Sequence, residues 1–167
     1  MTTSTGSSRT VWWIVGIPLG LISAGFGVFL YFSVNQARWD SRVRELCARD
    51  GGVTVFETIS VSPEEFAALP TTGGQTAIPT QSAMKPKAPA FFTSSETVIT
   101  DGNPRVTRLE HLVKRRSDGK VIGRIISYSR VGGDFPTIAH PSSFRCPDYK
   151  KLTAGQAHFF QVERKSK

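Results

Sequence analysis

The sequence is poor in the residues that build metal and redox sites, since only 2 of its 167 residues are cysteines and 3 are histidines. No His-x-x-x-His or Cys-x-x-Cys spacing occurs, although zinc sites are commonly built from such pairs. No glycine-rich loop of the kind that holds phosphate groups is present either. We therefore expect no metal and no cofactor. Because no catalytic motif is visible, we also expect that the protein is not an enzyme.

Charged residues are missing from Val11 to Val34, a stretch of 24 positions. A helix needs about 20 apolar residues to cross roughly 30 Å of hydrocarbon, and only a helix satisfies its own backbone there. The sequence thus predicts a transmembrane helix over residues 11–34, preceded by a disordered tail over residues 1–10. A cleaved signal peptide would have a shorter apolar region and a small-residue cleavage site. We therefore expect a retained signal anchor.

Small residues recur every four positions within this span, at Gly16, Gly20 and Ala24. Such a smooth face lets two helices approach closely, which makes these residues candidates for helix pairing. The alternative is that glycine is simply frequent in transmembrane helices. We expect an integral membrane protein that forms a homo- or hetero-oligomer through this helix or through the domain that follows.

Two signals disagree about the side of the membrane on which the domain lies. Four arginines follow the span within 15 residues and one precedes it, which by the positive-inside rule would keep the domain in the cytoplasm. Cys47 and Cys146, in contrast, flank the domain and are its whole cysteine complement. A disulfide between them would need an oxidising compartment and, in the chain-entropy model, would add about 4 to 5 kcal/mol of stability. We give the cysteines more weight and predict an exported domain.

The domain itself is predicted to cover residues 35–150 and to begin with a juxtamembrane helix over residues 35–50. Trp39, Val43, Leu46 and Cys47 follow one another at helical spacing, which is typical of an amphipathic helix that packs on a domain. We expect this helix to continue the membrane span and to end at the two following glycines.

The next segment predicts a strand over residues 53–61 and then a short helix. Ser62, Pro63 and Glu65 form the pattern of a capping box with proline at the first helical position. Residues 70–95 contain four prolines and are predicted to be a long loop. We read this loop as a surface linker, with a binding loop as the alternative.

A strand over residues 96–100 leads to the clearest local signal, a hairpin over residues 105–131. Asp118 and Gly119 lie between two alternating runs, which favours a two-residue turn with Ser117 opposite Lys120. This register places His111 opposite Ile126. One face would then form the core, with these residues: Leu109, His111, Val113, Ile122, Ile126 and Tyr128. The predicted fold class is α+β, a single N-terminal transmembrane helix followed by a small antiparallel-sheet domain with a juxtamembrane amphipathic helix.

Basic residues gather near the tip of this hairpin, at Lys114, Arg115, Arg116 and Lys120. The chain carries a formal net charge of +8, which favours anionic partners. These four residues are candidates for contact with anionic lipid or polymer, and an ordinary solvated surface is the alternative. We expect no nucleic-acid partner, because an exported domain would seldom meet one.

Several segments together resemble a group of small, uncharacterised bacterial proteins. The segments are LCARDGGV at residues 46–53, RSDGKV at 116–121, SYSR at 127–130 and PSSFRCP at 141–147. Proteins of this group have an N-terminal hydrophobic anchor or signal and one cysteine near each end of the domain, and the resemblance implies no activity. The remaining residues, 151–167, are predicted to be a basic tail that contains one short strand.

Together these observations predict a single-pass protein of the bacterial inner membrane whose domain faces the periplasm. The expected function is that of a non-enzymatic interaction or structural module, bound to an envelope protein still to be identified. Two alternatives stay open. The domain could be a ligand-binding or catalytic domain with scattered residues, or its basic surface could bind anionic lipid or polymer.

Overall fold

A computed structural model describes residues 16–134 and 140–163 of the chain. The predicted N-terminal tail, the first residues of the predicted span and residues 164–167 lie outside these ranges. The first element is α2 (Ile17–Asp50), a helix of 34 residues whose first turn contains Pro18. The apolar span and the juxtamembrane helix are therefore one continuous helix, as predicted.

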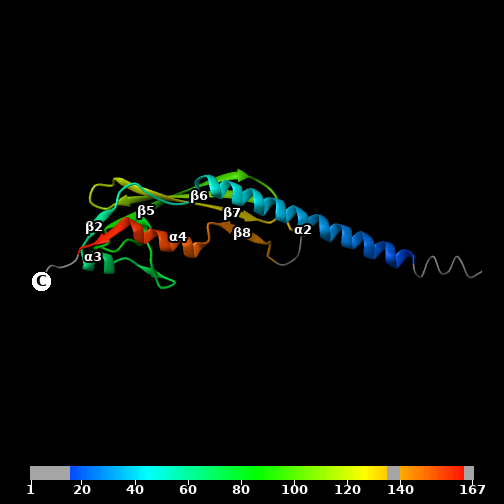
Figure 1. Cartoon of the computed structure of the whole chain (residues 1–167), viewed down its shortest axis with the longest axis horizontal. Helices are drawn as coiled ribbons and strands as arrows, with labels where there is room; N and C mark the ends of the chain where they lie inside the picture. Colours follow the sequence, from blue (N-terminus) through cyan, green and yellow to red (C-terminus); the bar gives the residue numbers. More distant parts are fainter. Residues whose placement is uncertain (1–15, 135–139, 164–167) are drawn as a thin grey trace, which may run out of the picture.

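The two halves of α2 have different surroundings. Side chains from Ile17 to Val34 are mostly exposed, and this part has the length and composition of a membrane-spanning segment. Figure 1 shows it projecting beyond the domain. In the second half Val43 and Cys47 are buried, with Trp39 and Leu46 partly buried beside them. The predicted apolar stripe is confirmed, because these are the four residues that the helical spacing identified.

The domain is built on a five-stranded sheet, mostly antiparallel, which confirms the α+β class. The strands β5 (Ala90–Thr100), β6 (Arg105–Arg115) and β7 (Val121–Val131) form a meander. Along the other edge of β7 lie β1 (Gly52–Val55) and β8 (Ser143–Cys146), each antiparallel to it. Since β1 directly follows α2, the anchor helix leads straight into the sheet.

The predicted hairpin register is wrong by one residue. His111 lies opposite Ile125, and Arg115 lies opposite Lys120, because the loop is four residues long and the pairing shifts at Ile122. A shift by one residue moves side chains to the other face of a sheet. Ile126 and Tyr128 therefore lie on the opposite face from the His111 side chain, and β7 is buried on both faces.

Each face of the sheet has its own apolar cluster. On the face that α2 covers, Val43 and Cys47 pack against Val106, Ile126 and Tyr128. We call the other side the open face, because only one half of it is covered. The covered half is the one farther from the apolar half of α2, and α4 (Tyr149–Gln156), η3 (Ala157–Phe159) and the segments around them pack on it. The residues buried there are Ile59, Val61, Leu69, Ile78, Ala88, Ala90, Val113, Ile122, Ile125, Leu152, Phe159 and Phe160.

Phe159 shows why the second cluster needs a small residue in the sheet. A β-carbon at Gly123 would lie 2.3 Å from the Phe159 ring and 2.4 Å from the carbonyl oxygen of Thr54. Only glycine leaves room for this ring, which is fully buried against β7.

The shorter elements complete the covered half of the open face. Strand β2 (Ile59–Val61) pairs in parallel with β9 (Phe160–Val162). The short helix α3 (Pro63–Ala67) begins with the predicted capping box. In it, Ser62 Oγ accepts a hydrogen bond from Glu65 N at 3.2 Å, and Glu65 Oε2 accepts one from Ser62 N at 2.8 Å. A two-stranded ribbon and a single 3-10 turn follow. These are β3 (Thr71–Thr72), β4 (Gln75–Thr76) and η2 (Gln81–Ala83).

Three predicted boundaries are wrong. The strand predicted over 53–61 is two strands, broken at residues 56–58 where the alternation also fails. The loop predicted over 70–95 ends before Ala90, because β5 begins there and pairs with β6 along its whole length. The segment after residue 150 belongs to the domain up to Val162, since its residues Leu152 and Phe159 are buried in the core. Its helix was missed because the segment has little apolar periodicity.

Several contacts fasten α2 to the sheet, among them an ion pair of Asp50 with Arg108 at 3.3 Å; four others we call the helix–sheet joint. The predicted disulfide between Cys47 and Cys146 is present, with the two Cα atoms 5.9 Å apart. Asp50 accepts a hydrogen bond from the Tyr128 hydroxyl at 2.6 Å. Nearest the span, the amide of Asn35 donates to the Gly133 carbonyl oxygen at 2.9 Å.

The fourth contact of the joint is a buried ion pair. Arg130 is fully buried, and its Nε donates to Asp40 Oδ1 at 2.6 Å. The same guanidinium donates to the Gly132 carbonyl oxygen and to Ser142 Oγ. Because the charge of Arg130 has been removed from water, it depends chiefly on Asp40, the one carboxylate of the described residues that it contacts directly; Asp134 is near enough for the charge of Arg130 to contribute to its lowered pKa.

We expect Asp40→Ala to lower the free energy of unfolding by about 3 to 5 kcal/mol, because it leaves the Arg130 charge buried and unpaired. Urea unfolding of the full chain in micelles, followed by circular dichroism, measures the loss. Arg38→Ala, which changes an exposed neighbour on the same helix, serves as the control. Equal stabilities of the two variants would contradict a structural role for the pair.

Candidate functional site

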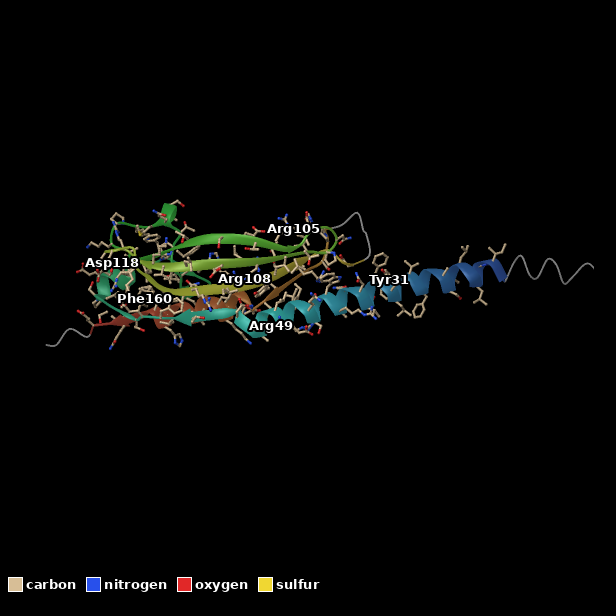
Figure 2. The ribbon with its side chains drawn as sticks, turned by 90° about the horizontal axis from the view of Figure 1, so that it is seen from above. Tyr31, Arg49, Arg105, Arg108, Asp118 and Phe160 are labelled. Carbon is tan, nitrogen blue, oxygen red and sulfur yellow. A yellow bond between two sulfur atoms is a disulfide. The ribbon has the colours of Figure 1, made fainter. Side chains whose placement is uncertain are left out.

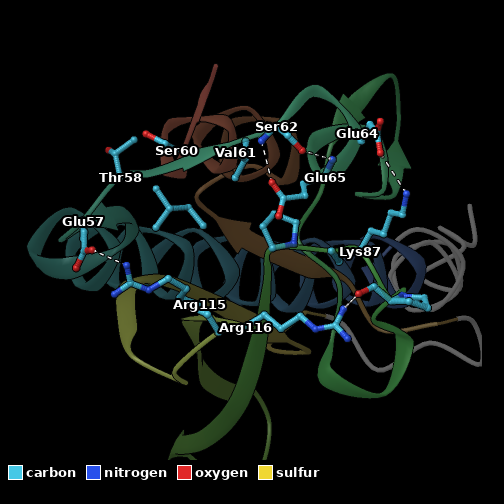
Figure 3. A pocket seen from close by; sticks show the side chains of 15 residues that line it. Glu57, Thr58, Ser60, Val61, Ser62, Glu64, Glu65, Lys87, Arg115 and Arg116 are labelled. Atoms are coloured by element: carbon cyan, nitrogen blue, oxygen red, sulfur yellow. Dashed lines mark hydrogen bonds and ion pairs between the residues drawn. The ribbon is translucent and has the colours of Figure 1, made fainter. Parts of the chain in front are cut away.

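The four basic residues predicted to contact anions lie at one end of the domain, beside a cavity of about 810 Å³. Figure 3 shows this cavity between the segment 57–62, the segment 86–89 and the hairpin loop. Glu57 accepts from Arg115 at 2.9 Å and from Lys120 at 2.5 Å. Half of the predicted basic cluster is thus tied to one carboxylate, and only the other half keeps its charge free of acidic partners.

The remaining two basic residues differ in their contacts. Arg116 donates to the carbonyl oxygens of Lys85 and Pro86, so its side chain is held in place without being neutralised. Lys114 has no acidic group within 4 Å among the described residues. The contact of the cluster with an anionic surface stays a prediction, and these two residues would carry it.

The hairpin end lies far from the apolar half of α2. In Figure 2 Tyr31 and Arg105 lie toward the projecting helix, whereas Asp118 lies at the opposite end of the domain. The 11 residues of β6 separate the two ends, which at about 3.4 Å per residue is roughly 35 Å. The helix–sheet joint fixes this direction, so the basic end faces away from the anchor.

The contribution of the Glu57 ion pairs to the stability of the fold depends on pH. The hydrogen bond from Lys120 is the largest cause and lowers the pKa of Glu57 from its ordinary value; burial opposes it, and the charges of Arg115 and Lys120 lower the pKa further. A carboxylate with a lowered pKa stabilises the fold above its ordinary pKa of about 4.3, and this contribution disappears as the pH falls through the lowered value.

We therefore expect the melting temperature of Glu57→Gln to lie below that of the wild type at pH 7 and to approach it near pH 3. Thermal unfolding at both pH values measures the difference. Glu45→Gln, which changes an exposed carboxylate on α2, should leave the melting temperature unchanged at either pH. A difference for Glu57→Gln that persists at pH 3 would argue against the ion pairs as its cause.

A second site lies on the open face, where the covered half meets the exposed half. We call it the Arg145 pocket and define it by Leu109, His111, Ile125, Ser127 and Arg145, which line a cavity of about 350 Å³ together with residues of η2, α4 and the segment before η2. A neighbouring cavity of about 280 Å³ on the side of the span shares three of these residues. Ligand pockets usually combine an apolar lining with a few converging polar groups, and this one does so.

The register of the sheet explains why these residues converge. Leu109 lies opposite Ser127, and His111 lies opposite Ile125, across the β6–β7 pair. Arg145 of β8 lies opposite Ser129, two residues from Ser127 on the same face. Strands β5, β6, β7 and β8 thus bring side chains from four segments to one place.

His111 is the titratable group of the pocket. Its Nδ1 lies 2.7 Å from Ser94 Oγ, and its ring packs edge-to-face on Phe92. Burial, and then the nearby charge of Arg145, lower its pKa below the ordinary value, which favours the neutral imidazole at pH 7. The Ser94–His111 separation is that of a nucleophile and its base, but no carboxylate contacts the ring among residues 16–134 and 140–163.

Of the predicted site residues, Cys47 and Cys146 form the expected disulfide. Cys47 lies in the disulfide and so cannot act as a nucleophile. Gly20 and Ala24 are exposed on the projecting half of α2, and Gly16 is half-exposed before it, so their role in helix pairing stays a prediction. Within the part of the chain that the structure describes, no cluster of histidine, cysteine and acidic side chains could hold a metal ion.

Sequence reasoning missed the Arg145 pocket. Arg145 stands beside Cys146, for which the sequence predicts only the disulfide, and Ser127 is not on the face that the predicted register assigns to the core. The one available signal is His111, which that register places on the core face. A correct register would have placed Ser127 beside it.

Comparison with protein-family models, with curated proteins and with solved structures found no match for this chain. The resemblance to small bacterial proteins stays a prediction.

Proposed function

We propose that this chain is a membrane-anchored, non-enzymatic interaction module that holds a partner or polymer of the bacterial cell envelope at a set distance from the membrane. The observation that carries the proposal is the helix–sheet joint. A flexible stalk would leave the domain free to reorient, whereas α2 runs unbroken from the apolar half to Asp50 and is fastened to the sheet by Asp40 and Cys47. Such an arrangement holds the domain at a fixed distance and direction from the apolar half of α2, as a spacing or docking module requires.

We further propose that α2 crosses the bacterial inner membrane once and that the domain faces the periplasm. The disulfide supports this side of the membrane, because such bonds persist in oxidising compartments and are rare in the cytosol. The arginines after the span argue for the opposite side, but long domains are translocated largely regardless of such charges.

Labelling with a membrane-impermeant thiol reagent in intact cells tests the orientation. We expect no labelling before reduction and labelling of Cys47 and Cys146 after reduction, because these are the only two cysteines. The double variant Cys47→Ser/Cys146→Ser is the control for background. Thiols that react without reduction, or only after lysis, would overturn the periplasmic assignment.

The basic hairpin end offers a second candidate function, the binding of an anionic polymer. Its distance from the anchor favours a polymer over the lipid surface that α2 enters, because roughly 35 Å exceeds the Debye length of about 8 Å at physiological salt. Lys114 and Arg116, which lack acidic partners among the described residues, would supply the attraction.

We expect binding of polyglutamate to the full chain in phosphatidylcholine nanodiscs to weaken as salt rises, and the variant Lys114→Gln/Arg116→Gln to bind several-fold more weakly. Fluorescence anisotropy of labelled polyglutamate measures both effects. The variant Arg42→Gln/Arg49→Gln removes the same charge from exposed positions of α2 and is the matched control. Equal weakening in the two variants would mean that binding depends only on the net charge of the chain, and would reject the hairpin end as a site.

A further inference from the structure

We propose that the Arg145 pocket binds a small amphipathic carboxylate, whose charged end is held by Arg145 and Ser127 and whose apolar body lies over Leu109 and Ile125. This site goes beyond the proposed interaction function and does not depend on it. Three observations lead to it, one on charge, one on a hydroxyl donor and one on the apolar floor.

The first observation is a cation without a counterion. Arg145, an exposed residue of β8, has no acidic group within 4 Å among the described residues, and it lines the two neighbouring cavities described above. The nearest other arginine of these cavities, Arg105, already faces Glu96 at 3.8 Å. One free guanidinium matches one carboxylate, since its planar fork donates two parallel hydrogen bonds to the two oxygens.

The second observation is a hydroxyl that is left to the cavity. Ser127 is 6% exposed, and within the described ranges its hydroxyl forms no hydrogen bond with the protein. Its oxygen is not among the buried atoms without a partner, so it keeps accessible surface and its O–H can donate to a ligand in the cavity that Ser127 lines. Ser127 lines the same two cavities as Arg145, so an oxygen bound by Arg145 would be within reach of this donor.

The third observation is the apolar part of the lining. Ile125 is buried on the floor, Leu109 is half-buried beside it, and Phe92 and Ile78 close the pocket toward the covered half. At about 350 Å³ the cavity lies at the lower end of the range for small-molecule sites. The size and lining fit a short acyl chain or a compact ring, and the single arginine favours a monoanion.

The experiment uses the full chain in phosphatidylcholine nanodiscs and three probes. Octanoate has both the charge and the apolar chain, octanol has the chain alone, and acetate has the charge alone. NMR signals of the His111 ring report occupancy, because His111 lines the pocket. We expect saturable binding of octanoate with a Kd at least tenfold below those of the other two probes.

Variants assign the effect to the pocket. Arg145→Gln should raise the Kd for octanoate about ten- to hundredfold, the range for hydrogen bonds to charged groups, whereas Arg49→Gln, a charge removed from an exposed position on α2, should leave it unchanged. Ser127→Ala should weaken binding several-fold and leave the melting temperature of the free protein unchanged or higher, because its hydroxyl has no partner to lose.

A second readout separates binding at Arg145 from nonspecific uptake of octanoate by the bilayer. Burial, and then the charge of Arg145, lower the pKa of His111; octanol would add to the burial alone, whereas octanoate would also neutralise that charge. The pKa of His111 should therefore be higher with octanoate bound than with octanol bound, and this difference should disappear in Arg145→Gln. Equal binding of octanol and octanoate, equal affinities of Arg145→Gln and Arg49→Gln, or equal pKa values of His111 with the two ligands would each overturn the proposal.

Discussion

The ion pair between Asp40 and Arg130 is the contact on which the arrangement of anchor and domain depends. Arg130 projects from the middle strand of the sheet and is fully buried, so the helix that covers it must present a carboxylate at one defined position. Asp40 meets this need at 2.6 Å, and the register that it sets also brings Cys47 to Cys146. The ion pair is specific in position, the disulfide is covalent, and together they fix one helix to one face of the sheet.

This attachment divides the domain into two ends with different surroundings. One end, near Asn35 and Gly133, lies beside the apolar half of α2, and the other end carries the hairpin loop. Because α2 is straight through the joint (Figure 1), the direction of the domain relative to the span is set by the fold. A fixed direction of the domain relative to the apolar helix, and not freedom of movement, is therefore the mechanical property of this protein.

The two faces of the sheet are used differently. The face under α2 is closed by the joint and serves stability. The open face is only half covered, and at the boundary between its two halves the Arg145 pocket presents an exposed arginine without an acidic partner among the described residues and a hydroxyl that forms no hydrogen bond there. At the hairpin end, in contrast, Arg115 and Lys120 are already paired with Glu57, and Arg115 also with Asp118. The pocket is thus the place where the domain has unmet binding capacity.

Local patterns in the sequence determined the apolar span, the amphipathic stripe of Trp39 and Val43, the capping box at Ser62, and the pairing of the only two cysteines, because each depends on spacing or on composition alone. The tertiary structure decided the hairpin register, since a shift at Ile122 depends on how β7 packs against both α2 and Phe159. It also decided that the segment after residue 150 folds into the core and that Ser127 and Arg145 share a pocket. These features join residues that are distant in sequence, and no local period encodes such contacts.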